Sequence, residues 1–220
     1  MVNFFQECVD YVEGRADYCL FERMLQTNNE LLEWLQGIVP EDKKMFVFDG
    51  TINDVVLVPY NVKVKLEECE NIQVGGPKGS PEYRYVVHNE ISNLISEAFP
   101  DRHFARDSGP EIDYDLCMDA CPQYIGGVEI GHANIIGALL NSIPRTLSKA
   151  NRKKQLKSKI LEAFHIEGKQ YPKWKQEPYW PVHNGQPMKF VRTVKVNSEV
   201  SVHYFVDIES GFERSIEDSY

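Results

Sequence analysis

The sequence predicts an α+β protein: a mainly helical, acidic body with a short β-hairpin, followed by a C-terminal three-strand antiparallel meander. Three observations predict this class. Apolar residues recur at helical spacing in several segments before residue 165, two short β-branched runs lie between residues 45 and 58, and three alternating runs follow residue 189. We therefore expect a helix-rich body over residues 1–165 and a connector with the meander, packed on that body, over residues 166–220. The 220 residues fit one domain or two small ones.

Two helices are expected before residue 40. Apolar residues recur at helical spacing over residues 4–12, behind Asn3, whose side chain suits a helix N-cap. Further on, Thr27 and Glu30 have the Thr-x-x-Glu form of a capping box, in which each residue satisfies a backbone N–H of the first turn. The apolar residues of 31–35 continue this second helix.

A short hairpin is expected next. Residues 45–48 and 55–58 are rich in β-branched and aromatic residues, and turn-forming residues lie between them. The segment 59–70 fits two structures, because its apolar residues alternate with charged ones as in a strand, whereas Pro59 also suits the start of a helix. The sequence leaves strand and helix open for this segment.

The middle of the chain alternates between loops and helices. Residues 75–81, GGPKGSP, predict a loop, and the long helix after it ends near Pro100. Residues 101–127 show little periodicity. Apolar spacing predicts two more helices, over residues 135–143 and 148–164.

The last fifty residues change in character. Residues 170–187 are rich in proline and aromatic residues, and we expect Trp174 and Trp180 to fill the core, because the prolines remove backbone donors from this stretch. Three alternating runs then predict the meander, at residues 190–196, 200–208 and 212–216. A three-strand sheet alone is too small to be stable, so it should pack on the last helix.

Composition and cysteine usage indicate a soluble cytoplasmic protein. Hydrophobic residues make up 42% and charged residues 26% of the chain, which disfavours the disordered, collagen-like and coiled-coil classes. No apolar stretch approaches the roughly 18–20 residues of a membrane span, and the first residues are acidic where a signal peptide is basic. Five cysteines at irregular spacing indicate reduced thiols.

Charge is unevenly distributed. Residues 1–144 hold 10 Lys and Arg against 24 Asp and Glu, net −14, whereas residues 145–220 hold 14 against 9, net +5. Such an acidic body repels nucleic acid and anionic membranes and attracts a basic partner. The seven cations between Arg145 and Lys159 are typical of a nucleic-acid face, but also of a solvated helix face or of a basic helix docked on the acidic body. The net negative charge of the chain disfavours nucleic acid, and so favours a solvated helix face or a docked basic helix.

The nearest approach to a metal site is Cys117-x-x-x-Cys121 with His132 downstream, interleaved with acidic residues. Structural zinc sites usually use a second ligand pair of the same kind, which is missing here. Packed free thiols are therefore the favoured interpretation of Cys117 and Cys121. A metal-binding protein or metal-dependent enzyme that uses the acids, cysteines and histidine of 113–132 is the alternative function.

No motif of a known catalytic class is present. Residues 126–132, GGVEIGH, have glycines before a helix but lack the Lys-Ser/Thr of a phosphate-binding loop, and their spacing differs from a dinucleotide fingerprint. No G-x-S-x-G, H-E-x-x-H or kinase signature occurs. The sequence therefore indicates no catalytic residue and no cofactor, and favours a protein that is not an enzyme.

One resemblance to known proteins lies near the C-terminus. The pattern P-x-W-x-Q-x-P-x-W-P is followed by N-G-x-P-M-x-F, Y-F-x-D, G-x-E-R and a terminal tyrosine, at residues 172–181, 184–190, 204–207, 211–214 and 220. It resembles a C-terminal module of uncharacterised bacterial proteins, some of which look like cytosolic immunity proteins of polymorphic toxin systems. The resemblance covers about 50 residues. It implies an α+β, non-catalytic, cytosolic protein and carries over no functional residue.

Together these observations predict a non-catalytic cytosolic binding protein, and specifically an immunity-type inhibitor of a basic toxin. The expected partner contacts are Glu111, Asp113, Tyr114, Asp115 and Asp119. We expect no membrane partner, and nucleic acid is disfavoured. The sequence leaves the oligomeric state open.

Overall fold

The chain forms an α+β structure in a computed structural model that describes residues 3–40, 44–48, 55–70, 77–126 and 130–219. It divides into two compact units, Met1–Glu111 and Ile112–Tyr220. Each unit has its own hydrophobic core. The division falls within the stretch 1–165 that we expected to form one helical body, because the later helices share their core with the meander rather than with the first helices.

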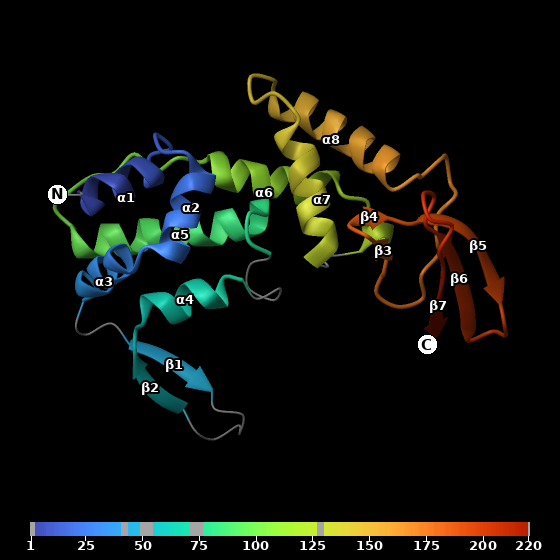
Figure 1. The fold of residues 1–220 in the computed structure, drawn as a ribbon, viewed down its shortest axis with the longest axis horizontal. Helices are drawn as coiled ribbons and strands as arrows, with labels where there is room; N and C mark the ends of the chain where they lie inside the picture. The colour runs from blue at the N-terminus through green and yellow to red at the C-terminus, as the bar shows by residue number, and fades with distance from the viewer. Residues whose placement is uncertain (1–2, 41–43, 49–54, 71–76, 127–129, 220) are drawn as a thin grey trace. The chain divides into compact units, whose positions relative to one another are not determined.

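Among the described residues, six helices begin in the first unit (Figure 1). They are α1 (Phe4–Val12), α2 (Tyr18–Thr27), α3 (Asn29–Gly37), α4 (Val62–Glu68), α5 (Pro81–Ala98) and α6 (Gly109–Ala120), the last of which continues into the second unit. The predicted N-cap of α1 is confirmed, because Asn3 accepts from the N–H of Gln6. Ser80 caps α5 in the same way and accepts from the N–H of Tyr83. The sequence reasoning missed α2 and α6.

The predicted capping box of the second helix was wrong by one residue. Thr27 is the last residue of α2, where its hydroxyl donates to the Arg23 carbonyl at 3.0 Å. Asn28 caps α3 instead, and its side-chain oxygen accepts from the N–H of Leu31 at 3.1 Å. Asparagine competes well with threonine at an N-cap, so the helix starts one residue later than the Thr-x-x-Glu pattern implies.

The predicted hairpin is confirmed in its two strands. β1 (Lys44–Phe48) pairs antiparallel with β2 (Val55–Pro59), with Phe46 opposite Leu57. The turn expected after β1 lies outside the described residues. The ambiguous segment after it is helical, because Asn61 caps α4 and the i, i+4 pair Val62 and Leu66 is buried.

The core of the first unit forms where α1 and α2 pack against α5. Tyr11 stacks on Phe21 with 4.2 Å between ring centroids, and the apolar face of α5 is buried against them. A buried ion pair joins α2 to α5, with 2.8 Å between Arg84 Nε and Glu22 Oε1. Charged groups at this depth must be paired, because an isolated one would lose its hydration without compensation.

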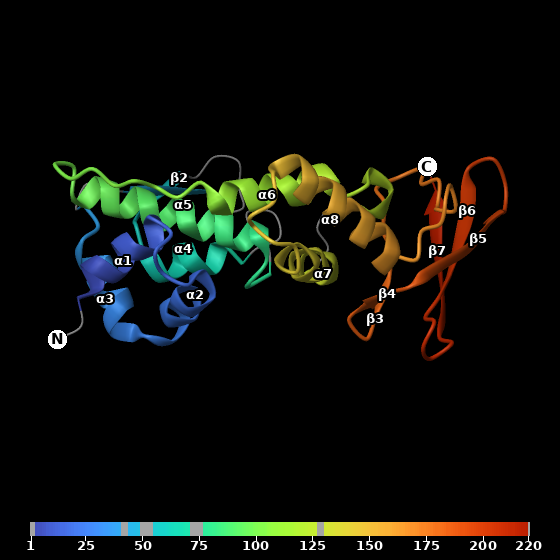
Figure 2. The same ribbon diagram turned by 90° about the horizontal axis from the view of Figure 1, so that it is seen from above.

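The second unit combines the end of α6 with two further helices and the meander (Figures 1 and 2). Its elements are η1 (Gln123–Ile125), α7 (Ile130–Asn141), α8 (Lys149–Ala163), β3 (Val182–His183), β4 (Gln186–Pro187), β5 (Lys189–Lys195), β6 (Val200–Val206) and β7 (Glu213–Ser219). The three-strand sheet has the predicted antiparallel order β5-β6-β7. Burial alternates along β6, whose inward residues include His203 and Phe205.

The tryptophan connector packs into this core, as expected. Trp180 is fully buried, contacts Phe164 and Phe205 edge-on, and donates its indole N–H to the Met188 carbonyl at 2.7 Å. Trp174 is half-buried, and its indole N–H donates to the Tyr124 carbonyl at 2.8 Å. The meander thus packs on α8 through aromatic contacts. Within the described residues, no helix combines the length and apolar character needed to cross a membrane.

Candidate functional site at helices α6 and α8

The acidic residues singled out on α6 lie against cations of α8 and of the turn before it. Asp113 accepts from Arg145 and from Arg152, each at 2.7 Å. Asp115 pairs with Lys149 at 2.9 Å and Asp119 with Lys153 at 3.0 Å. The basic segment of 145–159 is therefore docked on acids of its own chain through these four cations, which is one of the two interpretations that its sequence favoured.

The spacing of these residues explains the arrangement. Asp115 and Asp119 are four residues apart on α6, and their partners Lys149 and Lys153 are four residues apart on α8. Residues at i and i+4 share one face of a helix. Because each pair joins residues 34 positions apart, the chain direction of the two helices is the same along this contact.

Burial differs strongly along the contact. The side chains of Asp113 and Arg152 are only 5% and 7% exposed, whereas those of Asp115 and Lys149 are 49% and 51% exposed. An exposed pair contributes about 0–1 kcal/mol to stability, but breaking a buried pair costs about 3–5 kcal/mol. Asp113 is therefore the structurally decisive carboxylate of this site.

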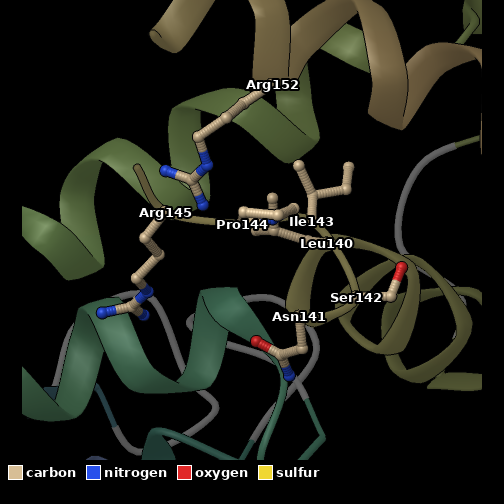
Figure 3. A pocket seen from close by; sticks show the side chains of 7 residues that line it. All are labelled: Leu140, Asn141, Ser142, Ile143, Pro144, Arg145 and Arg152. Carbon is tan, nitrogen blue, oxygen red and sulfur yellow. The ribbon is translucent and has the colours of Figure 1, made fainter. Parts of the chain in front are cut away.

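A cavity of about 370 Å³ adjoins the same arginines. It is lined by the end of α7, the turn after it and one residue of α8, namely Leu140, Asn141, Ser142, Ile143, Pro144, Arg145 and Arg152. Figure 3 shows Arg152 reaching down from α8 and Arg145 extending from the turn, with both guanidinium groups to one side of the turn and the apolar side chains beside them. The Nε atom of Arg152 is buried and has no hydrogen-bond partner among the described residues.

The remaining two expected partner contacts lie near the start of α6. Glu111 is exposed and Tyr114 is half-buried. Asp113, by contrast, is buried and is paired with two arginines. Sequence reasoning identified both the acids and the cations but not their pairing.

The cysteines and histidine of the metal alternative lie in the second unit. Cys117 and Cys121 are half-buried beside the core, and burial raises the pKa of the Cys121 thiol to about 11. His132 is buried, and its Nε2–H donates to the Trp180 carbonyl at 2.6 Å, which leaves Nδ1 without a partner among the described residues. Burial lowers the pKa of His132. No group of three or more His, Cys, Asp or Glu residues in the described ranges is arranged to hold a metal ion.

A buried polar network in the meander was not anticipated. His203 Nε2 donates to Asp218 at 3.3 Å, while Thr193 donates its hydroxyl to His203 Nδ1 at 2.8 Å. Asp218 also accepts the backbone N–H groups of Lys175 and Gln176, at 2.6 and 3.0 Å. The network fastens the connector to the sheet. The alternation of β6, which places His203 on the same face as Phe205, is the sequence signal that would have revealed it.

Comparison of the chain with protein-family models found no match. Comparisons with curated proteins and with solved structures likewise found none.

Proposed function

We propose that this protein is a non-catalytic binding protein whose N-terminal unit captures a basic protein partner. The observation that carries the proposal is the division of charge between the two units. Residues 1–111 hold 20 Asp and Glu against 10 Lys and Arg, whereas residues 112–220 hold 13 against 14. The acidic character therefore belongs to the first unit.

The ion pairs inside the first unit do not neutralise its net negative charge. Four of its cations are already bound to acids within the unit: Arg15, Lys65, Lys78 and Arg84. Glu30 and Glu33 on α3 and Glu67 on α4 are exposed and form no ion pair with any described residue. Complementary charge of this kind accelerates encounter with a basic partner and disfavours acidic ones.

Under this proposal, the partner contacts that the sequence predicts on α6 differ in how accessible they are to a partner. Glu111 is exposed and remains a candidate contact beside the acids of the first unit. A partner would have to displace Lys149 and Lys153 to reach Asp115 and Asp119. We therefore place the principal contacts on the first unit.

We propose specifically that the protein inhibits a toxin within the cytoplasm, as an immunity protein does. It rests on the resemblance of the C-terminal module and on the acidic first unit. An acidic surface suits a nuclease or another toxin with a basic active-site face, because such a face must attract anionic substrate.

Co-expression with the product of the adjacent gene tests this proposal. The double variant Glu30→Lys/Glu33→Lys reverses two exposed charges of the first unit, and Glu199→Lys/Glu209→Lys makes the same change of net charge in the second. We expect the wild type and the control variant to co-purify with the partner and to protect the host from it, and the first variant to lose both. A neighbour that is neither toxic nor bound would contradict the immunity role, and equal loss in both variants would contradict the assignment to the first unit.

A further inference from the structure

We propose that the outer face of the meander binds a second copy of this chain, so that two meanders pack face to face about a twofold axis that runs along β6. The outer face is the side of the β5-β6-β7 sheet that points away from the core of the second unit. This surface lies wholly in the second unit. The proposal therefore does not depend on the partner proposed for the first unit.

The first argument is the composition of the outer face. Phe205 points into the core, and successive residues of a strand point to opposite faces, so every second residue of β6 lies on the outer face. Antiparallel sheets with one face in water usually carry polar residues on that face. The outer residues of β6 instead form an apolar row, in which each member is half-buried: Val200, Val202, Tyr204 and Val206. On β5, Val194 lies opposite Val202 and is 41% exposed. Among the described residues, none of these five side chains belongs to the core cluster of the second unit.

The second argument is the charge on either side of this apolar row. Cross-strand pairing with β6 places two cations of β5 on the outer face, Lys189 and Arg192. The guanidinium group of Arg192 lies over the ring of Tyr204, 4.8 Å from its centroid, which confirms that the two side chains share a face. Pairing on the other side of β6 places two exposed carboxylates of β7 on the same face, Glu213 and Glu217. None of these four charged groups forms an ion pair with a described residue. The outer face is therefore basic along β5, apolar along β6 and acidic along β7.

The third argument is that this pattern is complementary to itself. A twofold axis parallel to β6 keeps each residue at its level along the strand and exchanges the two edges of the sheet, so β5 of one copy lies over β7 of the other. Lys189 then lies at the level of Glu213 of the other copy. Arg192 lies between Glu213 and Glu217 of the other copy, about 7 Å along the strand from each.

The alternative twofold arrangement is disfavoured by the same charges. An axis in the plane of the interface but perpendicular to the strands would place β5 over β5 and β7 over β7. Cations would then face cations and carboxylates would face carboxylates. The axis along β6 instead lets the apolar row of one copy pack against the same row of the other, as the inner faces of a β-sandwich do, with strand directions within about 30° of each other.

Sedimentation equilibrium of the full chain, from about 1 to about 200 μM, tests for the dimer. We expect the mean mass to rise with concentration and to level off at the mass of two chains. The mass of one chain at every concentration would overturn the proposal and would assign the outer face to a different occupant. A mass that rises beyond two chains would also overturn it, because pairing of β5 with the β7 edge of the next copy forms an open polymer and not a closed dimer.

Charge reversal tests the arrangement of the two copies. Arg192→Glu and Glu217→Arg each bring like charges together at two equivalent places in the dimer, so we expect each to raise the dissociation constant by at least about tenfold. The double variant Arg192→Glu/Glu217→Arg exchanges the two charges and restores opposite charges across the interface. We expect its dissociation constant to lie within about threefold of the wild-type value. A double variant as weak as the single variants would contradict the placement of β5 over β7.

Lys195→Glu is the matched control for Arg192→Glu. It makes the same change of net charge on the same strand, and Lys195 is also exposed. Lys195 lies opposite the buried Ser201, however, and is therefore on the inner face of the sheet. We expect this variant to change the dissociation constant by less than about twofold. Equal weakening in Lys195→Glu and Arg192→Glu would indicate a general effect of net charge and would contradict a contact through the outer face.

Val202→Lys tests the apolar row independently of the charges beside it. The substitution places an ammonium group in the middle of the row, on the face that points away from the core. We expect the variant to retain the wild-type circular dichroism spectrum and to raise the dissociation constant by at least about tenfold, because a charge buried without a partner is strongly unfavourable. Wild-type affinity in Val202→Lys would contradict burial of the row in the dimer.

Discussion

Asp113→Ala removes the carboxylate that Arg145 and Arg152 share, and we expect it to destabilise the second unit strongly. The side chain of Asp113 is 5% exposed and accepts two charge-assisted hydrogen bonds of 2.7 Å. Its loss leaves the buried guanidinium group of Arg152 without a counter-charge. Breaking a buried pair in this way costs about 3–5 kcal/mol, against a total stability of roughly 5–15 kcal/mol for a domain.

Asp119→Ala is the matched control, because Asp119 lies on the same helix and pairs with a single lysine. Both side chains of that pair are about half exposed, so its loss should cost no more than about 1 kcal/mol. Urea unfolding followed by tryptophan fluorescence measures the difference, since Trp174 and Trp180 lie in the second unit. Comparable losses in the two variants would refute the reasoning that burial decides the contribution of each carboxylate.

Three further predictions concern other parts of the chain. Trp180→Ala should cost about 3–5 kcal/mol, because the side chain is fully buried; an unchanged melting temperature would contradict its core position. Gly126→Ala should lower the melting temperature markedly in a thermal scan, because φ is +98° and the added Cβ would lie 2.3 Å from the Pro178 carbonyl oxygen. Gly79→Ala is the control, because φ at Gly79 is also positive but the added Cβ would lie in open space. Burial raises the pKa of Glu82 from 4.5 to about 7. Between these two pH values the folded state holds a proton that the unfolded state releases, so the free energy of unfolding falls as pH rises from 4.5 through 7. Glu82→Gln should therefore be more stable than wild type at pH 8 by about 1–2 kcal/mol, after allowance for partial exposure, and less different at pH 4.5; a constant difference across this range would contradict the raised pKa.

Alternation and capping made parts of the fold predictable. The strands of the meander and the starts of α1 and α5 depend on local patterns, which the sequence displays directly. The segment 59–70 was ambiguous because its apolar residues fit both a strand and one face of a short helix, and the Asn61 cap distinguishes the two.

Helix α6 shows what local patterns could not reveal. Between Gly109 and Ala120 the fully enclosed apolar residues are few, and Asp113 is buried among them. A buried carboxylate breaks the apolar periodicity, and it is tolerated only because Arg145 and Arg152, more than thirty residues away, neutralise it. The same long-range pairing concealed how the acids and cations of the site are matched. It also explains the position of the unit boundary, because α8 belongs with α6 and the meander.

The distribution of charge between the units gives the central claim its physical basis. Excess acid on residues 1–111 is not balanced within that unit, whereas Asp115 and Asp119 of α6 are paired with lysines of α8. Binding of a basic partner should therefore depend on the first unit and should weaken with salt, as expected for exposed charges.

The most direct test is the association rate constant of this protein with the product of the adjacent gene, measured from about 20 to about 500 mM salt for wild type, Glu30→Lys/Glu33→Lys and Glu199→Lys/Glu209→Lys. We expect the wild-type rate to fall by at least about tenfold across this range, the first variant to be about tenfold slower than wild type at low salt, and the control to remain within about twofold. A rate that is independent of salt, or one that is reduced equally by both variants, would contradict recognition through the acidic N-terminal unit.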